Sequence, residues 1–397
     1  MTGDLRPQQS AGGAPLKLFL VAVEESGDQL GAALIRALRL RLGDAVQFSG
    51  VGGRKMAAEG FVSLHSTDDF SIMGFSAIPR LLPTALKRLR ETLRAIREQR
   101  PHGLIVIDSP GYSLWVAYCA KRADPSLKVI DYVSPSVWAW RPSRAPSMRR
   151  YVDHVLALLP FEPDVHRRLG GPPCSYVGHP IVEQAAQFRP SAEEALRRLT
   201  APPVLVVLPG SRSGEVQRLS PIFGETIGRV RDQIGPLEVV VPAAPHLVER
   251  VRASAKSWPV TPRIVTEQAD KLAAFRVARA ALAKSGTVTL ELALAGVPMV
   301  AAYKVSAFDA WFIRRMVNLP SVILANLVIG ENVVPELLQE DCTPEQLSAA
   351  LIPLLGDTPE RRRQVEAFAR LDDILQIGAA APAMRAAEVV LAEVGHQ

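Results

Sequence analysis

The chain is poor in cysteine and in long apolar runs, and each shortage excludes a class of protein. Its 397 residues include three cysteines, Cys119, Cys174 and Cys342, with no CxxC or Cys/His spacing. We therefore expect a reducing compartment, with neither a disulfide framework nor a structural zinc site. No segment approaches the roughly 20 apolar residues that span a bilayer. Residues 1–15 lack a basic start followed by an apolar core. They predict a short disordered lead and a cytoplasmic protein.

The common signatures of nucleotide and metal binding are also missing. GxxxxGK[ST] does not occur, and the nearest match to GxGxxG, at 50–60, has Lys55 where the third glycine should fall. HExxH and DxD are absent as well, so no metal or other cofactor is expected. The net charge of +6 indicates an anionic partner. That partner is not expected to be nucleic acid, because RNA-binding signatures are missing.

Short apolar runs alternate with helical stretches along most of the chain. A first series lies at 17–23, 45–50, 103–108, 128–133 and 154–160, and a second at 203–212, 237–243, 263–267, 278–286 and 298–303. This alternation predicts an α/β fold of two doubly wound parallel sheets, with ligands bound at the carboxyl ends of the strands. The expected divisions are a disordered lead over 1–15, domains over 16–182 and 183–357, and C-terminal helices over 358–397.

Two strand–helix loops in the second domain have anion-binding features. In LPGSR (208–212), Gly210 permits close backbone approach, the N–H groups around Ser211 face an anion, and Arg212 adds a forked cation. The alternative is an ordinary turn with a surface arginine.

The second of these loops is KSGTVTLELALAG (284–296). Its Ser285, Gly286 and Thr287 begin a helix after an apolar strand, which suits a diphosphate. Glu291 follows one turn later, where a carboxylate can accept both hydroxyls of a ribose. The alternative is a Ser/Thr cap with a glutamate partner. Taken together, the two loops identify the second domain as the nucleotide holder.

Carboxylates mark two strand ends in the first domain. Asp108 ends a buried strand in IDSPGYS (107–113), where it can serve as a general base. Glu24, Ser26 and Asp28 lie in the first strand–helix turn. For Asp108, Ser26 and Asp28, a helix cap is the competing interpretation.

Aromatic residues are concentrated in one part of the chain. Of five tryptophans and six tyrosines, seven lie between Tyr112 and Tyr151. Three of them, Tyr132, Trp138 and Trp140, fall in the Pro-broken stretch YVSPSVWAWRPSR (132–144) together with Arg141 and Arg144. Rigid aromatic content in a loop predicts a binding role. A hydrophobic plug between helices is the alternative, and for Trp138 it is the preferred one.

A basic amphipathic helix is expected over 82–96. Its apolar residues follow a 3.6-residue spacing, with basic residues on the other faces. Such a helix can lie on an anionic membrane, or it can pack on its own sheet with a solvated basic face. A second apolar and basic cluster at 311–315 favours membrane contact.

Many collinear motifs resemble one family, the lipid-A-disaccharide synthases, which are inverting glycosyltransferases of the GT-B fold. The matching stretches are SGDQLGA (26–32), GVGGRKMAAEG (50–60), SIMGF (71–75), IDSPGYS, YVSPSVWAWRPSR, LPFEP (159–163), YVGHP (176–180), LPGSRSGEV (208–216), SGTVTLELAL (285–294), AYKVS (302–306), ANLVIGENVVPELLQ (325–339) and TPEQL (343–347). The resemblance implies UDP-2,3-diacylglucosamine as donor and 2,3-diacylglucosamine 1-phosphate as acceptor. The product would be the β-1,6-linked disaccharide 1-phosphate, with release of UDP.

The resemblance also implies roles for residues. Asp108 would be the base, Arg212 would meet the diphosphate charge, and Asn326 would belong to the donor site. The 132–144 loop would face the acceptor. An apolar slot for acyl chains would involve Val23, Ile72, Met73, Phe75, Trp115 and the 82–96 helix. The chain departs from the family pattern at Val23, Tyr112, Ser113, Ala325 and Glu331, which bears on acyl or sugar selectivity more than on reaction type.

The family resemblance further implies peripheral contact with the inner membrane and a homodimer. Two other interpretations stay open from the sequence. One is a different UDP-sugar enzyme of the same architecture, such as a UDP-N-acetylglucosamine epimerase or the undecaprenyl-linked N-acetylglucosaminyltransferase. The other is a non-catalytic binder of nucleotide sugars or nucleic acid.

Overall fold

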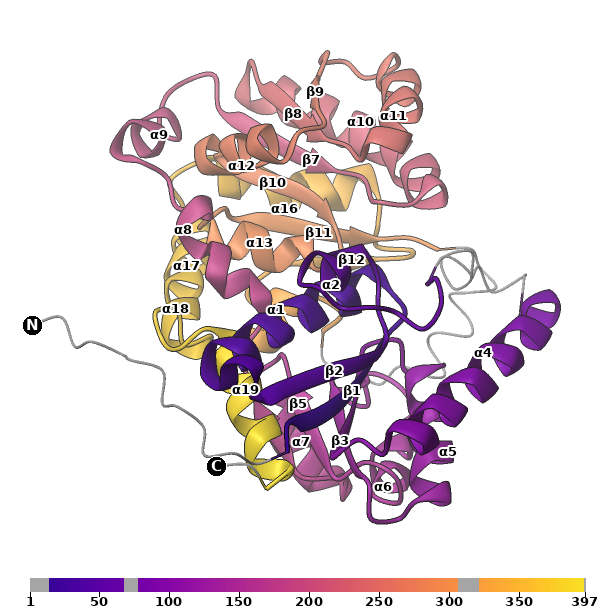
Figure 1. The fold of residues 1–397 in the computed structure, drawn as a ribbon. Helices are drawn as coiled ribbons and strands as arrows, with labels where there is room; N and C mark the ends of the chain where they lie inside the picture. The colour runs from indigo at the N-terminus through magenta and orange to yellow at the C-terminus, as the bar shows by residue number, and fades with distance from the viewer. Residues whose placement is uncertain (1–13, 68–77, 306–320, 396–397) are drawn as a thin grey trace, which may run out of the picture. The chain divides into compact units, whose positions relative to one another are not determined.

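The structure is a computed structural model that describes residues 14–67, 78–305 and 321–395. It divides into two compact units, each built on its own six-stranded parallel sheet (Figure 1). The first unit contains the described residues up to Pro180 and those from Gly378 onward, and the second is Ile181–Ile377. The two parallel sheets with helices on their faces confirm the predicted α/β fold.

The first unit has the strand order β2-β1-β3-β4-β5-β6. Its strands are β1 (Leu16–Ala22), β2 (Val46–Val51), β3 (Gly103–Ile107), β4 (Lys128–Tyr132), β5 (His154–Ala157) and β6 (Cys174–Tyr176). Its helices are α1 (Glu25–Leu42), α2 (Arg54–Ala58), α4 (Ile78–Gln99), α5 (Ser113–Ala123), α6 (Arg144–Met148), α7 (Glu162–Leu169) and α19 (Pro382–Glu393). Because β1 pairs with β2 on one side and β3 on the other, the strand order reverses between β1 and β3, where such sheets bind ligands.

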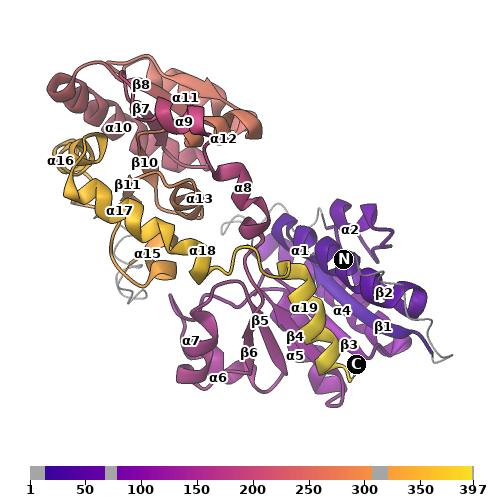
Figure 2. The same cartoon turned by 90° about the vertical axis from the view of Figure 1, so that its left-hand side faces the viewer.

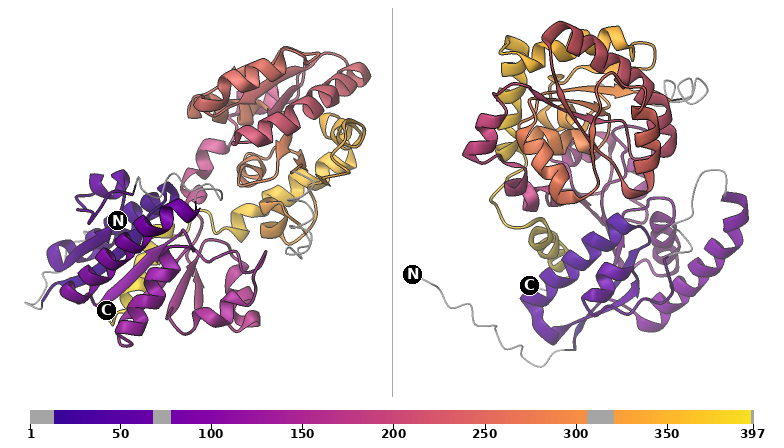
Figure 3. Two further views of the ribbon diagram at one scale, coloured as in Figure 1. Left: turned by 90° about the vertical axis from the view of Figure 1, so that its right-hand side faces the viewer. Right: turned by 90° about the horizontal axis from the view of Figure 1, so that it is seen from above.

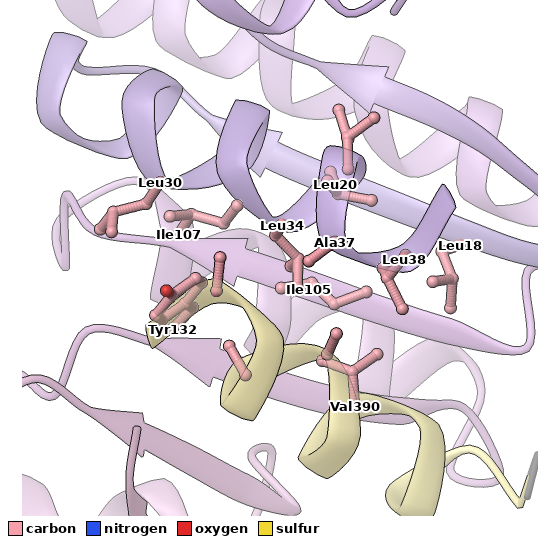
Figure 4. Close-up of a cluster of buried hydrophobic side chains, with 14 of the residues drawn as sticks. Leu18, Leu20, Leu30, Leu34, Ala37, Leu38, Ile105, Ile107, Tyr132 and Val390 are labelled. Carbon is pink, nitrogen blue, oxygen red and sulfur yellow. The ribbon is translucent and has the colours of Figure 1, made fainter. Parts of the chain in front are cut away.

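Both faces of this sheet are covered by helices, which explains the unbroken apolar runs of its strands. Side chains alternate along a strand, so Leu18 and Leu20 of β1 point to one face and Phe19 and Val21 to the other. The first face packs against α1 and α19, and Figure 4 shows Leu34 of α1 and Val390 of α19 over the same strands. The second face packs against α4 and α5.

The second unit has the strand order β12-β11-β10-β7-β8-β9. Its strands are β7 (Val204–Leu208), β8 (Glu238–Pro242), β9 (Arg263–Val265), β10 (Ala280–Lys284), β11 (Met299–Tyr303) and β12 (Glu336–Leu338). Its helices are α8 (Ala185–Phe188), α9 (Ala192–Arg197), α10 (Ser213–Ile234), α11 (Val248–Ala255), α12 (Gln268–Val277), α13 (Val288–Leu294), α15 (Leu324–Ile329), α16 (Pro344–Leu355), α17 (Pro359–Ala369) and α18 (Leu371–Ile374). Here the strand order reverses between β7 and β10.

The helices after residue 358 divide between the two units (Figure 2). In the second unit, α17 contacts α13 and α16, and Gln364 of α17 exchanges two hydrogen bonds with the backbone of Met299 in β11. In the first unit, α19 packs against α1, and the further views of Figure 3 show its yellow ribbon against the indigo elements. The final helix therefore completes the core of the unit that begins the chain.

Helix α4 uses its apolar residues inside the first unit. Leu89 and Ile96 are buried against the sheet, with Leu93 packed beside them. Arg90, Arg94 and Arg97 are exposed. The arrangement matches the surface-helix alternative rather than an apolar stripe open to lipid. Among the described residues, no helix combines the length and apolar content needed to cross a bilayer.

Candidate functional site

Asp108 lies where the strand order of the first sheet reverses, directly after β3. Its Oδ2 accepts a hydrogen bond from the Ser26 hydroxyl at 2.5 Å, and its Oδ1 accepts the Ser109 N–H at 2.7 Å. Ser26 belongs to the first turn of α1, which follows β1. The structure therefore brings together two predicted site residues that are far apart in sequence.

The backbone around Asp108 is strained. Asp108 and Ser109 have φ values of 54° and 49°, a left-handed conformation that costs a non-glycine residue roughly 1–2 kcal/mol. The Asp108 N–H donates to the carbonyl of Tyr132 in the neighbouring β4, which fixes this turn. The helix-cap alternative for Asp108 is not seen, because no described side chain caps α5. Strain of this kind is concentrated at functional sites.

The other acids of the first turn differ from Asp108. The Asp28 carboxylate accepts the N–H groups of Gly53, Lys55 and Met56 at 2.8, 2.7 and 3.0 Å and is nearly buried. Asp28 therefore orders the start of α2 and has little capacity left for a ligand. Glu24 precedes α1 and is exposed.

The aromatic loop separates into a part that packs on buried residues and a part that lies beside arginines, although Trp138 and Trp140 are both half-buried. Trp138 donates from its indole N–H to Glu162 at 3.2 Å and packs edge-on against Phe161, so it acts as the predicted plug. Trp140 instead lies against Arg141 and Arg144, whose guanidinium carbons are 4.2 and 5.9 Å from its ring centroid. The second part offers two cations beside a rigid ring.

Buried acids lie beneath this loop. Burial raises the pKa of Glu162 to about 7, although its carboxylate accepts the Leu159 N–H at 3.0 Å. Burial, with a smaller contribution from nearby Asp108, raises the pKa of Asp131 in β4 well above its ordinary value. Oδ2 of Asp131 has no hydrogen-bond partner among the described residues.

Burial also lowers the pKa of His179 to about 4, so its imidazole is neutral at pH 7.

A pocket of about 560 Å³ opens at the carboxyl ends of β7 and β10, where the strand order of the second sheet reverses. One side is formed by β8, β9 and the segments after them, and is largely apolar. The other side carries the predicted loops. Among the lining residues are Gly210, Ser211, Arg212, Glu215, Pro242, Ala244, Val265, Lys271, Lys284, Gly286, Thr287 and Glu291.

Four of the five charged side chains that line this pocket form two ion pairs. Lys271 Nζ lies 2.5 Å from Glu291 Oε2, and Lys284 Nζ lies 3.1 Å from Glu215 Oε1. The other Glu215 oxygen accepts the N–H groups of Ser211 and Arg212 at 3.0 and 3.2 Å. The backbone donors predicted to face an anion are thus occupied by an internal carboxylate, as in a capping box.

Two residues predicted to bind the nucleotide sugar make hydrogen bonds within the protein instead. The Ser285 hydroxyl donates to the carbonyl of Val322 at 2.9 Å. The Asn326 amide is 1% exposed, donates to Val334 O and Glu336, and accepts the N–H groups of Val333 and Val334. With both ends engaged, Asn326 orders the turn after α15 and does not line the pocket.

Sequence reasoning missed Glu215, Lys271 and Lys284. Glu215 stands three residues after Arg212, the capping-box spacing, and Lys284 directly precedes the SGT motif. These spacings were the available signals. Within the described ranges, no three His, Cys, Asp or Glu side chains come together to hold a metal ion. Ile72, Met73, Phe75 and the 311–315 cluster lie outside the described residues, and Val23 is buried in the core.

The fold defines a class before any family is considered. A glycosyltransferase of kitacinnamycin covers 96% of this chain and 99% of its own with a TM-score of 0.62 at 19% identity. A UDP-GlcNAc 2-epimerase from Neisseria meningitidis, solved with UDP-GlcNAc, covers 95% of this chain and all of its own with a TM-score of 0.58 at 11% identity. Two such sheets with these neighbours define the GT-B glycosyltransferase-like fold.

The family follows from sequence comparison. Residues 18–390 match the family model for lipid-A-disaccharide synthetase. A lipid-A-disaccharide synthase from Rhodopseudomonas palustris is 58% identical over 98% of both chains, and one from Nitrobacter hamburgensis is 56% identical over 96% of both. The chain belongs to the lipid-A-disaccharide synthase family, as the sequence motifs predicted.

Proposed function

We propose that the protein joins UDP-2,3-diacylglucosamine to 2,3-diacylglucosamine 1-phosphate, giving the β-1,6 disaccharide 1-phosphate and UDP. The observation that carries this proposal is the family match over residues 18–390. Another UDP-sugar enzyme considered from the sequence, the UDP-GlcNAc epimerase, shares the fold at 11% sequence identity. Likeness at that level extends to the fold alone.

The donor's nucleotide would bind in the pocket of the second unit. The apolar side around Pro242 and Val265 suits a base, and the Glu291 carboxylate suits the ribose hydroxyls. Arg212 is exposed at the pocket and supplies a forked cation for the diphosphate. For Glu291 to accept hydroxyls, Lys271 shares or releases the carboxylate.

Asp108 would act as the general base. Its carboxylate takes the proton of the acceptor hydroxyl while that oxygen attacks C1 of the donor sugar from the face opposite UDP. The new C1–O bond forms as the bond from C1 to the phosphate oxygen breaks, and UDP leaves with the electron pair. Ser26 and the Ser109 N–H each hold one carboxylate oxygen, which leaves the remaining lone pairs for the proton.

Arg141 and Arg144 would receive the acceptor phosphate, because they stand beside Trp140 with free access on the Arg141 side. In α4, peripheral membrane contact would rest on exposed basic residues such as Arg90 and Arg94, since Leu89 and Ile96 are already buried. Homodimer formation stays a prediction from the family resemblance, which light scattering can check.

The test is to incubate the purified protein with both lipid substrates and to separate the products. Wild type should release UDP and disaccharide in equal amounts, and Asp108→Ala should lose about 10²–10⁴-fold in rate. If wild type forms no disaccharide with any acyl length tried, the proposal is wrong. Near-normal turnover by Asp108→Ala would overturn the base assignment alone.

A further inference from the structure

Lys284 is a pocket residue to which neither the motifs nor the proposed reaction gives a role. It ends β10, and its side chain is 21% exposed inside the pocket. Its ammonium lies 3.1 Å from Glu215 and 5.3 Å from the centroid of the Tyr303 ring. An ion pair on one side and an aromatic face on the other hold the cation in place.

The position of this cation relative to the SGT turn is informative. A Cβ added to Gly286 would lie 3.8 Å from Lys284 Nζ, and Gly286 itself lines the pocket. A phosphate group seated against the Gly286 backbone would therefore meet the ammonium with a change of side-chain rotamer at most. The turn and the lysine form one surface for an anion.

The charge balance of the pocket makes a second phosphate-binding cation necessary. Lys271 is already 2.5 Å from Glu291, the proposed ribose-binding acid. Among the described lining residues, Arg212 would then be the only unpaired side-chain cation to act beside the SGT turn on a diphosphate of at least two negative charges. Glu215 is satisfied by two backbone N–H groups without Lys284, so it can release the lysine at small cost.

We propose that Lys284 binds the diphosphate of the nucleotide sugar and holds the departing UDP together with Arg212, exchanging its ion pair with Glu215 for the phosphate. This inference rests on the proposed function, in which the pocket takes a nucleotide sugar. Negative charge grows on the phosphate oxygen as its bond to C1 breaks, so the ammonium stabilises the transition state more than the bound substrate.

The test compares ligands with and without phosphates on Lys284→Ala. Titration calorimetry should show UDP binding weakened about tenfold or more, whereas uridine, followed by NMR titration, should bind within about twofold of wild type. In turnover, kcat should fall more than KM rises. Lys284→Arg should recover most of the UDP affinity. Lys256→Ala, which removes the same charge from a residue outside this pocket, should behave as wild type.

A second pair of variants separates phosphate binding from support of the loop. Glu215→Gln keeps an oxygen acceptor for the Ser211 and Arg212 N–H groups and removes the ion pair. If Lys284 binds phosphate, Lys284→Ala still weakens UDP binding in the Glu215→Gln background. Loss of the effect in that background, or equal weakening of uridine and UDP, would overturn the inference. Wild type that binds no UDP would instead refute the proposed function.

Discussion

The two units share one architecture and differ in how they build the point where strand order reverses. In the first unit, Asp108 stands on a backbone with positive φ at two successive non-glycine residues. In the second, the turn after β7 has Gly210 with φ of 129°, and the pocket beside it is lined by paired lysines and glutamates. The first unit fixes the position of a single carboxylate. The second has an open pocket whose lysines can exchange a glutamate partner for a ligand.

This difference corresponds to two physical tasks. Proton transfer needs one group held in a narrow range of positions, and a strained, hydrogen-bonded turn supplies that. Binding a charged ligand needs side chains of opposite charge that are held in position before the ligand binds. The ion pairs inside the pocket hold the lysines in position in this way. The comparison therefore supports proton transfer in the first unit, and binding of the nucleotide and of its departing diphosphate in the second, as proposed above.

Among the substitutions in the second unit, Arg212→Ala should have the largest effect on the reaction rate. Loss of the forked cation should reduce kcat about 10²–10³-fold, because the leaving diphosphate loses its strongest donor. Arg218→Ala is the matched control, because Arg218 is an exposed arginine of the following helix α10 that does not line the pocket. Steady-state rates measure both. Equal rates for the two variants would break the assignment of Arg212.

Ser26→Ala should reveal positioning in the first unit. Without the 2.5 Å hydrogen bond, the Asp108 carboxylate can rotate away, and kcat should fall about 10- to 100-fold. UDP affinity should not change. Ser26→Thr, which retains the hydroxyl, should recover much of the rate. A fall in UDP affinity matching the fall in rate would contradict a purely first-unit role.

Glu162→Gln should change the pH dependence of stability. The folded state keeps the Glu162 proton up to a pKa of about 7, whereas the unfolded chain loses it near 4.5. The protonated acid therefore favours the folded state below pH 4.5, and this stability is lost as pH rises to 7, by roughly 2–3 kcal/mol. Urea unfolding at pH 5 and pH 8 should show a smaller difference in the variant. The exposed Glu366→Gln in the second unit should follow wild type.

Arg90→Gln with Arg97→Gln should give the smallest effect. Both side chains are exposed on α4, and Glu91 and Glu98 on the same helix pair with its neighbouring basic residues. Sedimentation with anionic vesicles should fall several-fold, since each basic residue near such a surface contributes about 1 kcal/mol at most. Unchanged sedimentation would remove α4 from the proposed membrane contact.

Local patterns predicted β1–β5 and β7–β11, because burial on both faces leaves continuous apolar runs such as 103–108 and 203–208. They did not predict the three-residue strands β6 and β12. They also predicted that Asp108 and Glu291 lie at strand and helix ends. Local patterns could not distinguish acidic residues that bind a ligand from acidic residues that hold the backbone. Asp28 is used by backbone N–H groups about 25 residues away, and this contact depends on how the 50–56 segment folds.

The lysines of the pocket also could not be identified as site residues from local patterns. Lys271 comes from α12 and Lys284 from β10, and each meets a glutamate on a different element. A lysine in a helix or at a strand end is ordinary in sequence. Only the pairing of β7 with β10 brings such residues to one edge of the sheet. The chemistry of the pocket therefore depends on contacts that periodicity and spacing do not encode.

The division of tasks is tested most directly by measuring UDP affinity and disaccharide formation for Asp108→Asn and Glu291→Gln in parallel. The account predicts that Asp108→Asn retains UDP affinity within about twofold and loses roughly 99.9% of turnover. Glu291→Gln should weaken UDP binding about tenfold. Asp108→Asn that loses UDP affinity as Glu291→Gln does, or that turns over near the wild-type rate, would contradict it.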